Sequence, residues 1–393
     1  MNVVISAGGR FHAHHLAQQL IRKNSLCKLF TFDYTKADTA TLAPAYVQVA
    51  PLCKHLNDLF VACQAGRFVD KARFNTCKDN LFDHYVAARI PTLSPFDIFV
   101  GWAHYAHHSI YAARKAGAKI IIESGSCHIV AQQLLLHEEY QRWGISYAPI
   151  APATIDKMQA EYLLSDFIMT LSSYAHQSFL DQGIPAHKLL QTPCGIDVEY
   201  FLQPPQELHC DKKFRVIFVG LVTLRKGIQY LLKAWNQLKL PEHETELCIV
   251  GAQQKDFVRI AHQLPIATNV TFIGPTDRAT LKKLYYASSV FVLPSLEDGF
   301  GMVIGEAMAC GLPVICTTST AAPDLITDAK HGFLVKPANA NDLAEKIAWC
   351  FTNQQQAQHM GLHGKRRIQD FSWETYGDHV FDIYTTILGR SNT

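Results

Sequence analysis

The fold is decided by one stretch, Pro294-Ser-Leu-Glu-Asp-Gly-Phe-Gly-Met-Val-Ile-Gly-Glu306-Ala-Met-Ala-Cys-Gly-Leu-Pro-Val-Ile315. An apolar run leads into an acidic pair and a glycine loop, and a helical segment then ends at a Gly-Leu-Pro break before a second apolar run. This order of strand, loop, helix and strand is typical of a parallel α/β sheet. Gly299 and Gly301 let the loop backbone approach a ligand closely. The N–H groups and positive dipole end of the helix then predict a site for an anion such as a diphosphate.

Two carboxylates flank this loop. Asp298 precedes it, and Glu306 lies within the helix, with seven residues between them. Because carboxylates accept hydrogen bonds from vicinal hydroxyls, we expect one to bind a sugar and the other a nucleotide ribose. A glycine loop before a helix is also a structural feature of many α/β proteins, so the loop alone leaves both interpretations open.

Apolar runs alternate with helical segments in both halves of the chain, which predicts an α/β fold of two Rossmann-like, doubly wound parallel-sheet domains facing each other across a cleft. The break around 203–206 separates an N-terminal domain, 1–203, from a C-terminal domain, 204–370, and the tail, 371–393, is expected to form an amphipathic helix. The predicted strands are Asn2–Ala7, Leu26–Phe32, Ile98–Gly101, Lys119–Glu123, Phe167–Leu171, Arg215–Gly220, Thr245–Gly251, Val270–Gly274, Val290–Pro294, Pro313–Thr317 and Gly332–Val335.

The whole stretch 294–315 resembles the acidic–seven residues–Glu motif of the retaining nucleotide-sugar glycosyltransferases with two Rossmann-like domains (GT-B), the group 1 or family 4 type. The resemblance implies a donor site in the C-terminal domain, formed by the backbone and side chains of Gly299, Phe300, Gly301, Met302 and Val303. The first acid of the family motif is usually Glu. Here the spacing falls on Asp298, with Glu297 just before it, so either carboxylate is a candidate for the donor sugar.

Other segments carry the same resemblance. Phe218-Val-Gly-Leu-Val-Thr-Leu-Arg225-Lys226-Gly227 implies a strand, with Gly220 at its end, followed by a pair of cations that clamp the donor diphosphate. Gly274 is implied to contact the nucleobase through its backbone. The segment 193–201 resembles the family's interdomain crossing. The segment 371–374 resembles the start of its closing helix, which implies that the tail, 371–393, crosses back onto the N-terminal domain. In the N-terminal half, Gly8, Gly9 and Arg10 occupy the place of the glycine loop that faces the donor phosphates.

Histidine is abundant, with 19 residues. In Glu123-Ser-Gly-Ser-Cys-His128, a predicted strand runs into a loop of small residues. The resemblance implies a histidine after this strand, close to the reacting sugar. His128 is the candidate, and His104, after the preceding strand, is its rival. A metal site is the alternative use of two histidine clusters, but the family needs no metal, so none is expected. Glu138 and Glu139 are expected to shape the acceptor side. The two clusters are His12, His14 and His15, and His104, His107 and His108.

Composition excludes several classes of protein. A net charge of +2, with mixed signs along the chain, argues against nucleic-acid binding. The 11 cysteines form no Cys-x-x-Cys pair, which favours reduced thiols in a cytoplasmic protein. No apolar run is long enough for a membrane span or a signal peptide. The stretch 54–89, in which Arg67, Lys71, Arg73 and Lys78 alternate with Phe60, Phe68, Phe74 and Phe82, is either a peripheral contact with the inner membrane face or an ordinary amphipathic surface.

The resemblance therefore implies a retaining, metal-independent hexosyltransferase without a cofactor, using a UDP-, GDP- or ADP-sugar and an acceptor hydroxyl on a glycan, a lipid-linked molecule or a small molecule. The catalytic residues implied are His128, Arg225, Lys226, Asp298 and Glu306. Two alternatives stay open: a sugar-nucleotide epimerase or hydrolase of the same fold, and a non-catalytic nucleotide-sugar-binding protein.

Overall fold

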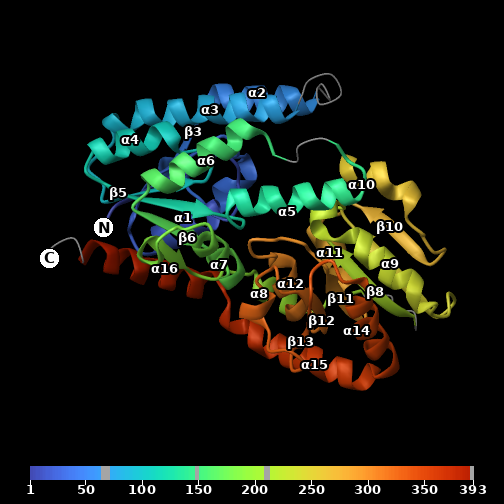
Figure 1. Ribbon diagram of the computed structural model, residues 1–393. Coiled ribbons are helices and arrows are strands. Elements are labelled where there is room, and N and C mark those ends of the chain that lie inside the picture. The colour runs from blue at the N-terminus through green and yellow to red at the C-terminus, as the bar shows by residue number, and fades with distance from the viewer. Residues whose placement is uncertain (63–70, 147–149, 208–212, 390–393) are drawn as a thin grey trace.

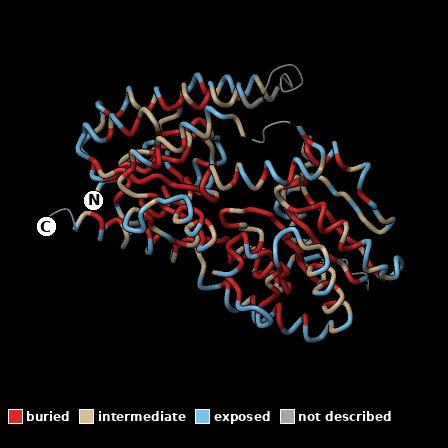
Figure 2. The backbone as a smooth tube through the Cα atoms, in the orientation of Figure 1, coloured by how far each residue is buried: buried red, intermediate tan, exposed pale blue. Residues whose placement is uncertain are grey.

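The chain forms two α/β domains that lie side by side (Figure 1). The computed structural model describes residues 1–62, 71–146, 150–207 and 213–389. Each domain has one sheet, and every strand pair within these sheets is parallel. Buried residues concentrate on the two sheets and the inner faces of their helices (Figure 2). This confirms the fold class predicted from the alternating pattern.

The N-terminal sheet has seven strands in the described residues, in the order β3-β2-β1-β4-β5-β6-β7. Its central strands are mostly apolar and almost wholly buried because helices cover both faces of the sheet. The strands are β1 Val3–Ser6, β2 Leu26–Thr31, β3 Val47–Val49, β4 Ile98–Trp102, β5 Lys119–Ser124, β6 Phe167–Thr170 and β7 Leu189–Gln191. The helices are α1 Ala13–Arg22, α2 Pro51–Ala62, α3 Lys71–Arg89, α4 His107–Lys115, α5 Ile129–Arg142, α6 Pro152–Leu164, α7 Ser173–Asp181 and α8 Val198–Leu202.

The C-terminal sheet has six strands in the part of the chain that is described, in the order β10-β9-β8-β11-β12-β13. The order reverses between β8 and β11, so the carboxyl ends of these two strands form the switch point where ligands bind in such sheets. The strands are β8 Phe214–Val219, β9 Thr245–Val250, β10 Val270–Gly274, β11 Val290–Leu293, β12 Val314–Thr317 and β13 Gly332–Val335. The helices are α9 Ile228–Leu238, α10 Lys255–Ile260, α11 Arg278–Tyr286, α12 Met302–Ala309, α13 Ala322–Leu325, α14 Ala340–Thr352, α15 Gln354–Arg367 and α16 Trp373–Gly389.

All eleven predicted strands are present, with ends that differ by at most one residue. The pattern missed β3 and β7, the two edge strands of the N-terminal sheet. Each has three residues and is only partly buried, so neither carries the apolar run by which the other strands were recognised.

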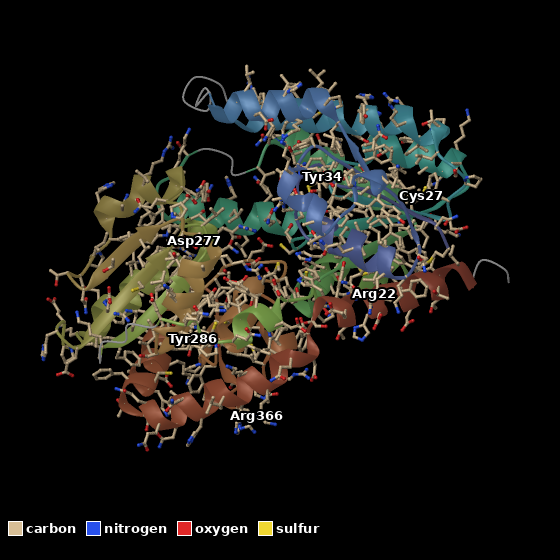
Figure 3. All side chains as sticks on the ribbon, turned by 180° about the vertical axis from the view of Figure 1, so that it is seen from behind. Arg22, Cys27, Tyr34, Asp277, Tyr286 and Arg366 are labelled. Atoms are coloured by element: carbon tan, nitrogen blue, oxygen red, sulfur yellow. The ribbon has the colours of Figure 1, made fainter. Side chains whose placement is uncertain are left out.

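The last helix, α16, leaves the C-terminal domain and lies against α1 of the N-terminal domain (Figure 1). Gly377 makes this contact close, because a Cβ there would come within 2.5 Å of Cβ of Gln19. At the rim, Asp378 pairs with Arg22 and lies 2.8 Å from Lys23 Nζ; Figure 3 shows Arg22 beside this helix. The imidazole of His15 stacks on the indole of Trp373, with ring centroids 3.8 Å apart.

A second contact between the domains runs along α5. Glu139, nearly fully buried, accepts hydrogen bonds from Gln229 Nε2 and the Tyr230 hydroxyl of α9, both at 2.9 Å. Its own helix contributes Arg142 Nη1 at 2.8 Å, and the indole of Trp143 donates at 2.7 Å. Glu139 therefore joins the two domains and does not line an acceptor site, which corrects the expectation for this residue. Glu138 beside it is exposed.

The stretch 54–89 is partly buried and partly exposed. Lys78 and Phe82 are buried in the N-terminal domain, with Lys78 Nζ 3.9 Å from the ring centroid of Phe32. Arg67 and Phe68 lie outside the described residues. Within the described ranges, no helix has the length and apolarity needed to cross a membrane.

Candidate active site

A tight loop of the C-terminal domain holds Lys226 and Asp298 side by side. The loop follows β8 and ends in a 3-10 turn, Leu224–Lys226, after which Gly227 has a left-handed φ of 71°. A Cβ on Gly227 would come within 1.9 Å of the Pro294 carbonyl oxygen, so glycine is required for the loop to pack against the end of β11. Lys226 Nζ forms an ion pair with Asp298, and the two side chains are only 12% and 13% exposed.

Asp298 is held in its ionised form. Burial alone would raise the pKa of this carboxyl, but the Lys226 ammonium and the Arg225 guanidinium outweigh burial and keep the pKa below its usual value. The pair thus presents a carboxylate that accepts from hydroxyls next to an ammonium that donates to anions. A sugar joined to a phosphate needs both.

Glu297 faces a different environment from its neighbour Asp298. It is fully buried and accepts three hydrogen bonds: from Arg225 Nη1 at 2.8 Å, from the Cys127 backbone N–H at 3.1 Å and from Gln132 Nε2 at 2.7 Å. The last two donors belong to the N-terminal domain. Glu297 thus ties the domains together, while Asp298 is the acid that faces the space between them.

The N-terminal domain contributes a second pair of acid and base. His12, the residue before α1, lies next to Glu123, near the carboxyl end of β5, with Nε2 and Oε1 2.7 Å apart. Both side chains are buried. His104, in the loop after β4, lies with Nδ1 3.3 Å from Asp79 Oδ2, and its backbone N–H donates to Glu161.

The two pairs line one cavity between the domains, with a volume of about 440 Å³. It lies where the carboxyl ends of both sheets face each other, the place that the α/β architecture predicts for a ligand. Its lining is Phe11, His12, Trp102, Ala103, His104, Glu123, Ser124, Gly125, Ser126, Met158, Leu171, Cys194, Lys226, Asp298, Phe300, Gly301, Met302 and Val303.

Most of the residues expected in the 298–303 segment therefore line the cavity. Gly299 does not, but it lies at its edge: a Cβ there would come within 2.1 Å of the Gly125 carbonyl oxygen of the other domain. Gly301 has a left-handed φ of 83° and directly precedes α12, as the glycine loop predicted. Arg225 lies behind Lys226, held by Glu297.

The first glycine loop is placed differently. Gly8 packs under Tyr105, where a Cβ would come within 2.2 Å of the ring, and Gly9 packs under Phe11. Arg10 turns to Asp38, with Nη2 2.6 and 2.7 Å from the two carboxylate oxygens. The glycines are needed for packing, the cation is already paired, and none of the three lines the cavity.

Glu306 lies one turn into α12 and is outside the cavity lining. It accepts a hydrogen bond from the buried Tyr285 hydroxyl at 3.1 Å, and burial raises the pKa of this carboxyl. Gly220 and Gly274 lie at the carboxyl ends of β8 and β10, on either side of Gly251 at the end of β9. These positions lie at the edge of the sheet predicted for the nucleotide.

His128 is placed in the protein interior. Its Nδ1 accepts the backbone N–H of Val130 and so caps α5, and its ring packs against Tyr162 and Phe179. Burial lowers its pKa to about 4. The cavity instead contains His104, the rival candidate, and His12, which was noted only within a histidine cluster. Sequence analysis did not single out Glu123. The available signal was an acid at the end of a predicted strand, Lys119–Glu123.

Comparison with known proteins then adds independent support. Residues 201–367, most of the C-terminal domain, match the family model described as glycosyl transferases group 1. Among curated relatives, the chain is 29% identical to an uncharacterized glycosyltransferase of Methanocaldococcus jannaschii over 177 residues, 44% of this chain and 45% of the relative. It is 24% identical to the GDP-mannose-dependent alpha-(1-6)-phosphatidylinositol monomannoside mannosyltransferase of Mycolicibacterium smegmatis, over 69% of this chain and 71% of that protein.

Solved structures share the two-domain fold of this chain over nearly its whole length. HepE of Anabaena, in complex with UDP and glucose, superposes with a TM-score of 0.69 at 17% identity, covering 98% of this chain and all of HepE. WaaG, a glycosyltransferase involved in lipopolysaccharide biosynthesis, gives a TM-score of 0.69 at 16% identity, covering 98% of this chain and 99% of WaaG. The predicted GT-B architecture is confirmed.

Proposed function

We propose that this chain transfers a hexose-type sugar from a nucleoside diphosphate sugar to an acceptor hydroxyl, with retention of the anomeric configuration and without a metal ion. The observation that carries the proposal is the buried Lys226–Asp298 pair, which lines the cavity between the two domains. The family match and the relatives with nucleotide-sugar names support the same class of donor.

In this proposal the donor lies along the C-terminal wall of the cavity. Its diphosphate binds Lys226 and the N-terminal end of α12, and its sugar binds Asp298. Its ribose binds Glu306, which then accepts a hydrogen bond in addition to the one from Tyr285. Arg225 Nη1 donates one hydrogen bond to Glu297. Because a guanidinium has five N–H donors, Arg225 can also donate to the phosphate. UDP, GDP and ADP remain the candidate bases; HepE was solved with UDP, and the mycobacterial relative is named for GDP-mannose.

The chemistry follows from these charges. As the bond between sugar and phosphate lengthens, negative charge grows on the leaving phosphate, and Lys226 and Arg225 stabilise it. These fixed cations supply the charge for which other enzymes use a divalent metal. The acceptor hydroxyl attacks from the face that the leaving group occupied, and a phosphate oxygen takes its proton. Contact between the domains keeps water from the positively charged sugar.

The test is a panel of UDP-, GDP- and ADP-hexoses, incubated with and without candidate acceptor sugars, with EDTA present throughout. We expect one donor to be consumed only when an acceptor is added, and NMR of the product to show the anomeric configuration of the donor. Efficient donor consumption without acceptor would identify an epimerase or hydrolase instead. Tight nucleotide binding with no turnover of any donor would identify a binding protein, and loss of transfer in EDTA would contradict metal independence.

A further inference from the structure

The short turn Leu224–Lys226, which carries both cations of the donor site, is fixed from outside at its first residue. The backbone N–H of Leu224 donates to Asp256 Oδ2 of α10 at 3.0 Å. The carbonyl oxygen of Leu224 accepts from Gln229 Nε2 of α9 at 3.1 Å. Hydrogen bonds within a 3-10 turn are few and poorly aligned. These two outside contacts therefore do much to decide where the two cations lie.

Asp256 is also bound to the N-terminal domain. The same Oδ2 that holds the turn accepts from the Tyr140 hydroxyl of α5 at 3.1 Å and from the Thr223 hydroxyl. Its Oδ1 accepts the backbone N–H of Phe257 at 2.8 Å. Asp256 is buried and has no ion-pair partner among the described residues. A buried charge that no cation offsets costs stability, which indicates that this carboxylate is kept for what its hydrogen bonds hold in place.

Gln229 forms the second link between the turn and α5. Its Nε2 donates to Glu139 Oε1 at 2.9 Å as well as to the Leu224 carbonyl oxygen. Gln229 is fully buried, and its Oε1 has no hydrogen-bond partner within the described part of the chain. Because an unpaired buried amide oxygen costs stability, an apolar side chain would serve packing better. The use of this amide is therefore its N–H groups, which join α5 to the turn.

Both links start from neighbouring residues of one helix. Glu139 and Tyr140 lie in the last turn of α5, which extends from the N-terminal domain to α9 and α10 (Figure 1). The helix also packs directly on the 3-10 turn. Through Asp256 and Gln229, the two residues reach the N–H and the carbonyl oxygen of Leu224, immediately before the two cations. A shift of α5 relative to the C-terminal domain would therefore release both contacts at once.

We infer that Tyr140 and Glu139 are positioning residues for the cations of the donor site. Tyr140 acts through Asp256 and Glu139 acts through Gln229, and together they hold Lys226 in place while α5 rests on the C-terminal domain. This contact between the domains thus sets the position of the charge that stabilises the leaving phosphate. The inference rests on the proposed function, because it names what holds the cations that the proposed reaction uses.

Removal of one hydroxyl tests the first link. Tyr140→Phe keeps the aromatic ring and removes the hydroxyl that binds Asp256, so urea titrations should show a folded protein. We expect kcat/KM for the donor to fall by about tenfold, since a displaced cation stabilises the leaving phosphate less well. Tyr111→Phe is the matched control, because Tyr111 on α4 is 54% exposed and lies outside the cavity lining, and it should leave kcat/KM unchanged.

A double-mutant cycle shows whether the effect passes through the cation. If Tyr140 acts through Lys226, Tyr140→Phe added to Lys226→Ala should lower kcat/KM by no more than about threefold, since only Arg225 is left to be displaced. A hydroxyl that only stabilised the fold or the domain contact would lower kcat/KM by the same factor in both backgrounds. Gln229→Met, which replaces the amide with an apolar side chain of similar length, should show the same coupling to Lys226→Ala.

Calorimetry with UDP, GDP and ADP repeats the cycle as dissociation constants and does not depend on turnover. Coupling between Tyr140 and Lys226 in either measurement supports the inference. Coupling in diphosphate binding without transfer to any acceptor would leave the inference standing and overturn the proposed function. Additive effects in both measurements, or a Tyr140→Phe protein equal to the parent, would overturn the inference and leave the transferase in place. If the parent binds none of the three diphosphates, both fail.

Discussion

The two walls of the cavity use the same kind of pair in different ways. On the C-terminal wall, Lys226 and Asp298 come from two short loops of one sheet, beside β8 and β11 at its switch point. On the N-terminal wall, His12 lies just before α1 and Glu123 near the end of β5, 111 residues away in the chain. The first pair places a permanent cation where a phosphate leaves. The second holds a buried imidazole beside a buried carboxylate. The two walls therefore differ in chemistry: one offers a fixed cation, and the other offers an imidazole.

The largest expected effect comes from removing the cation of the C-terminal wall. Lys226→Ala should lower kcat/KM for transfer by about 30-fold to 1000-fold, equal to about 2–4 kcal/mol of lost transition-state stabilisation. Lys283→Ala on α11 is the control, because Lys283 is exposed and lies outside the cavity lining. Steady-state kinetics with saturating donor measure the effect. A folded Lys226→Ala protein with near-normal turnover would remove Lys226 from the mechanism.

The second prediction separates the two walls. Gly299→Ala adds a methyl group where the Gly125 carbonyl oxygen of the other domain lies 2.1 Å away, so the domains cannot meet as they do here. We expect turnover to fall by about 100-fold, as for other small misplacements of reacting groups. Small-angle scattering should show an expanded molecule with unchanged thermal unfolding of each domain. Gly125→Ala is the scattering control, since a Cβ there meets nothing within 4 Å.

A smaller effect is expected at the contact between α5 and α9, which joins the two domains. In Glu139→Gln the amide nitrogen would face at least one group that can only donate, because Trp143 and Gln229 donate to one carboxylate oxygen and Arg142 to the other. The free energy of unfolding should therefore fall by about 1–3 kcal/mol. Glu138→Gln, on the exposed neighbour, should leave stability unchanged. Urea unfolding of both variants provides the comparison, and equal midpoints would show that Glu139 contributes little to holding the domains together.

The smallest effect concerns His128, the histidine that the structure keeps out of both walls. Its pKa in the folded protein is about 4, against about 6.5 when unfolded. Between these pH values the unfolded chain binds more protons, so stability falls as the pH is lowered through this window. His128→Asn keeps an acceptor for the Val130 N–H and should reduce proton uptake on unfolding by about one. Urea titrations from pH 4 to 7 would show a flatter dependence, whereas His187→Asn on the exposed surface should show none of it.

The sequence was most informative where function and local structure coincide. The segment 294–315 carries strand, loop and helix in one continuous pattern, and all central strands follow from their apolar runs because both faces are covered. The edge strands β3 and β7 escaped because partial burial leaves no such run. Arg10, predicted near the phosphates, pairs with Asp38, 28 residues away, a contact that no local pattern announces.

By itself, the amino-acid sequence determined the α/β class, the glycine loop before α12 and the neighbouring cations Arg225 and Lys226, because each depends on residues close together in the chain. The tertiary structure alone decided that Glu297 joins the domains while Asp298 faces the cavity, that His128 caps a helix, and that His12 meets Glu123. Those assignments depend on which loops the two sheets bring to their facing edges, and adjacent residues point in different directions there.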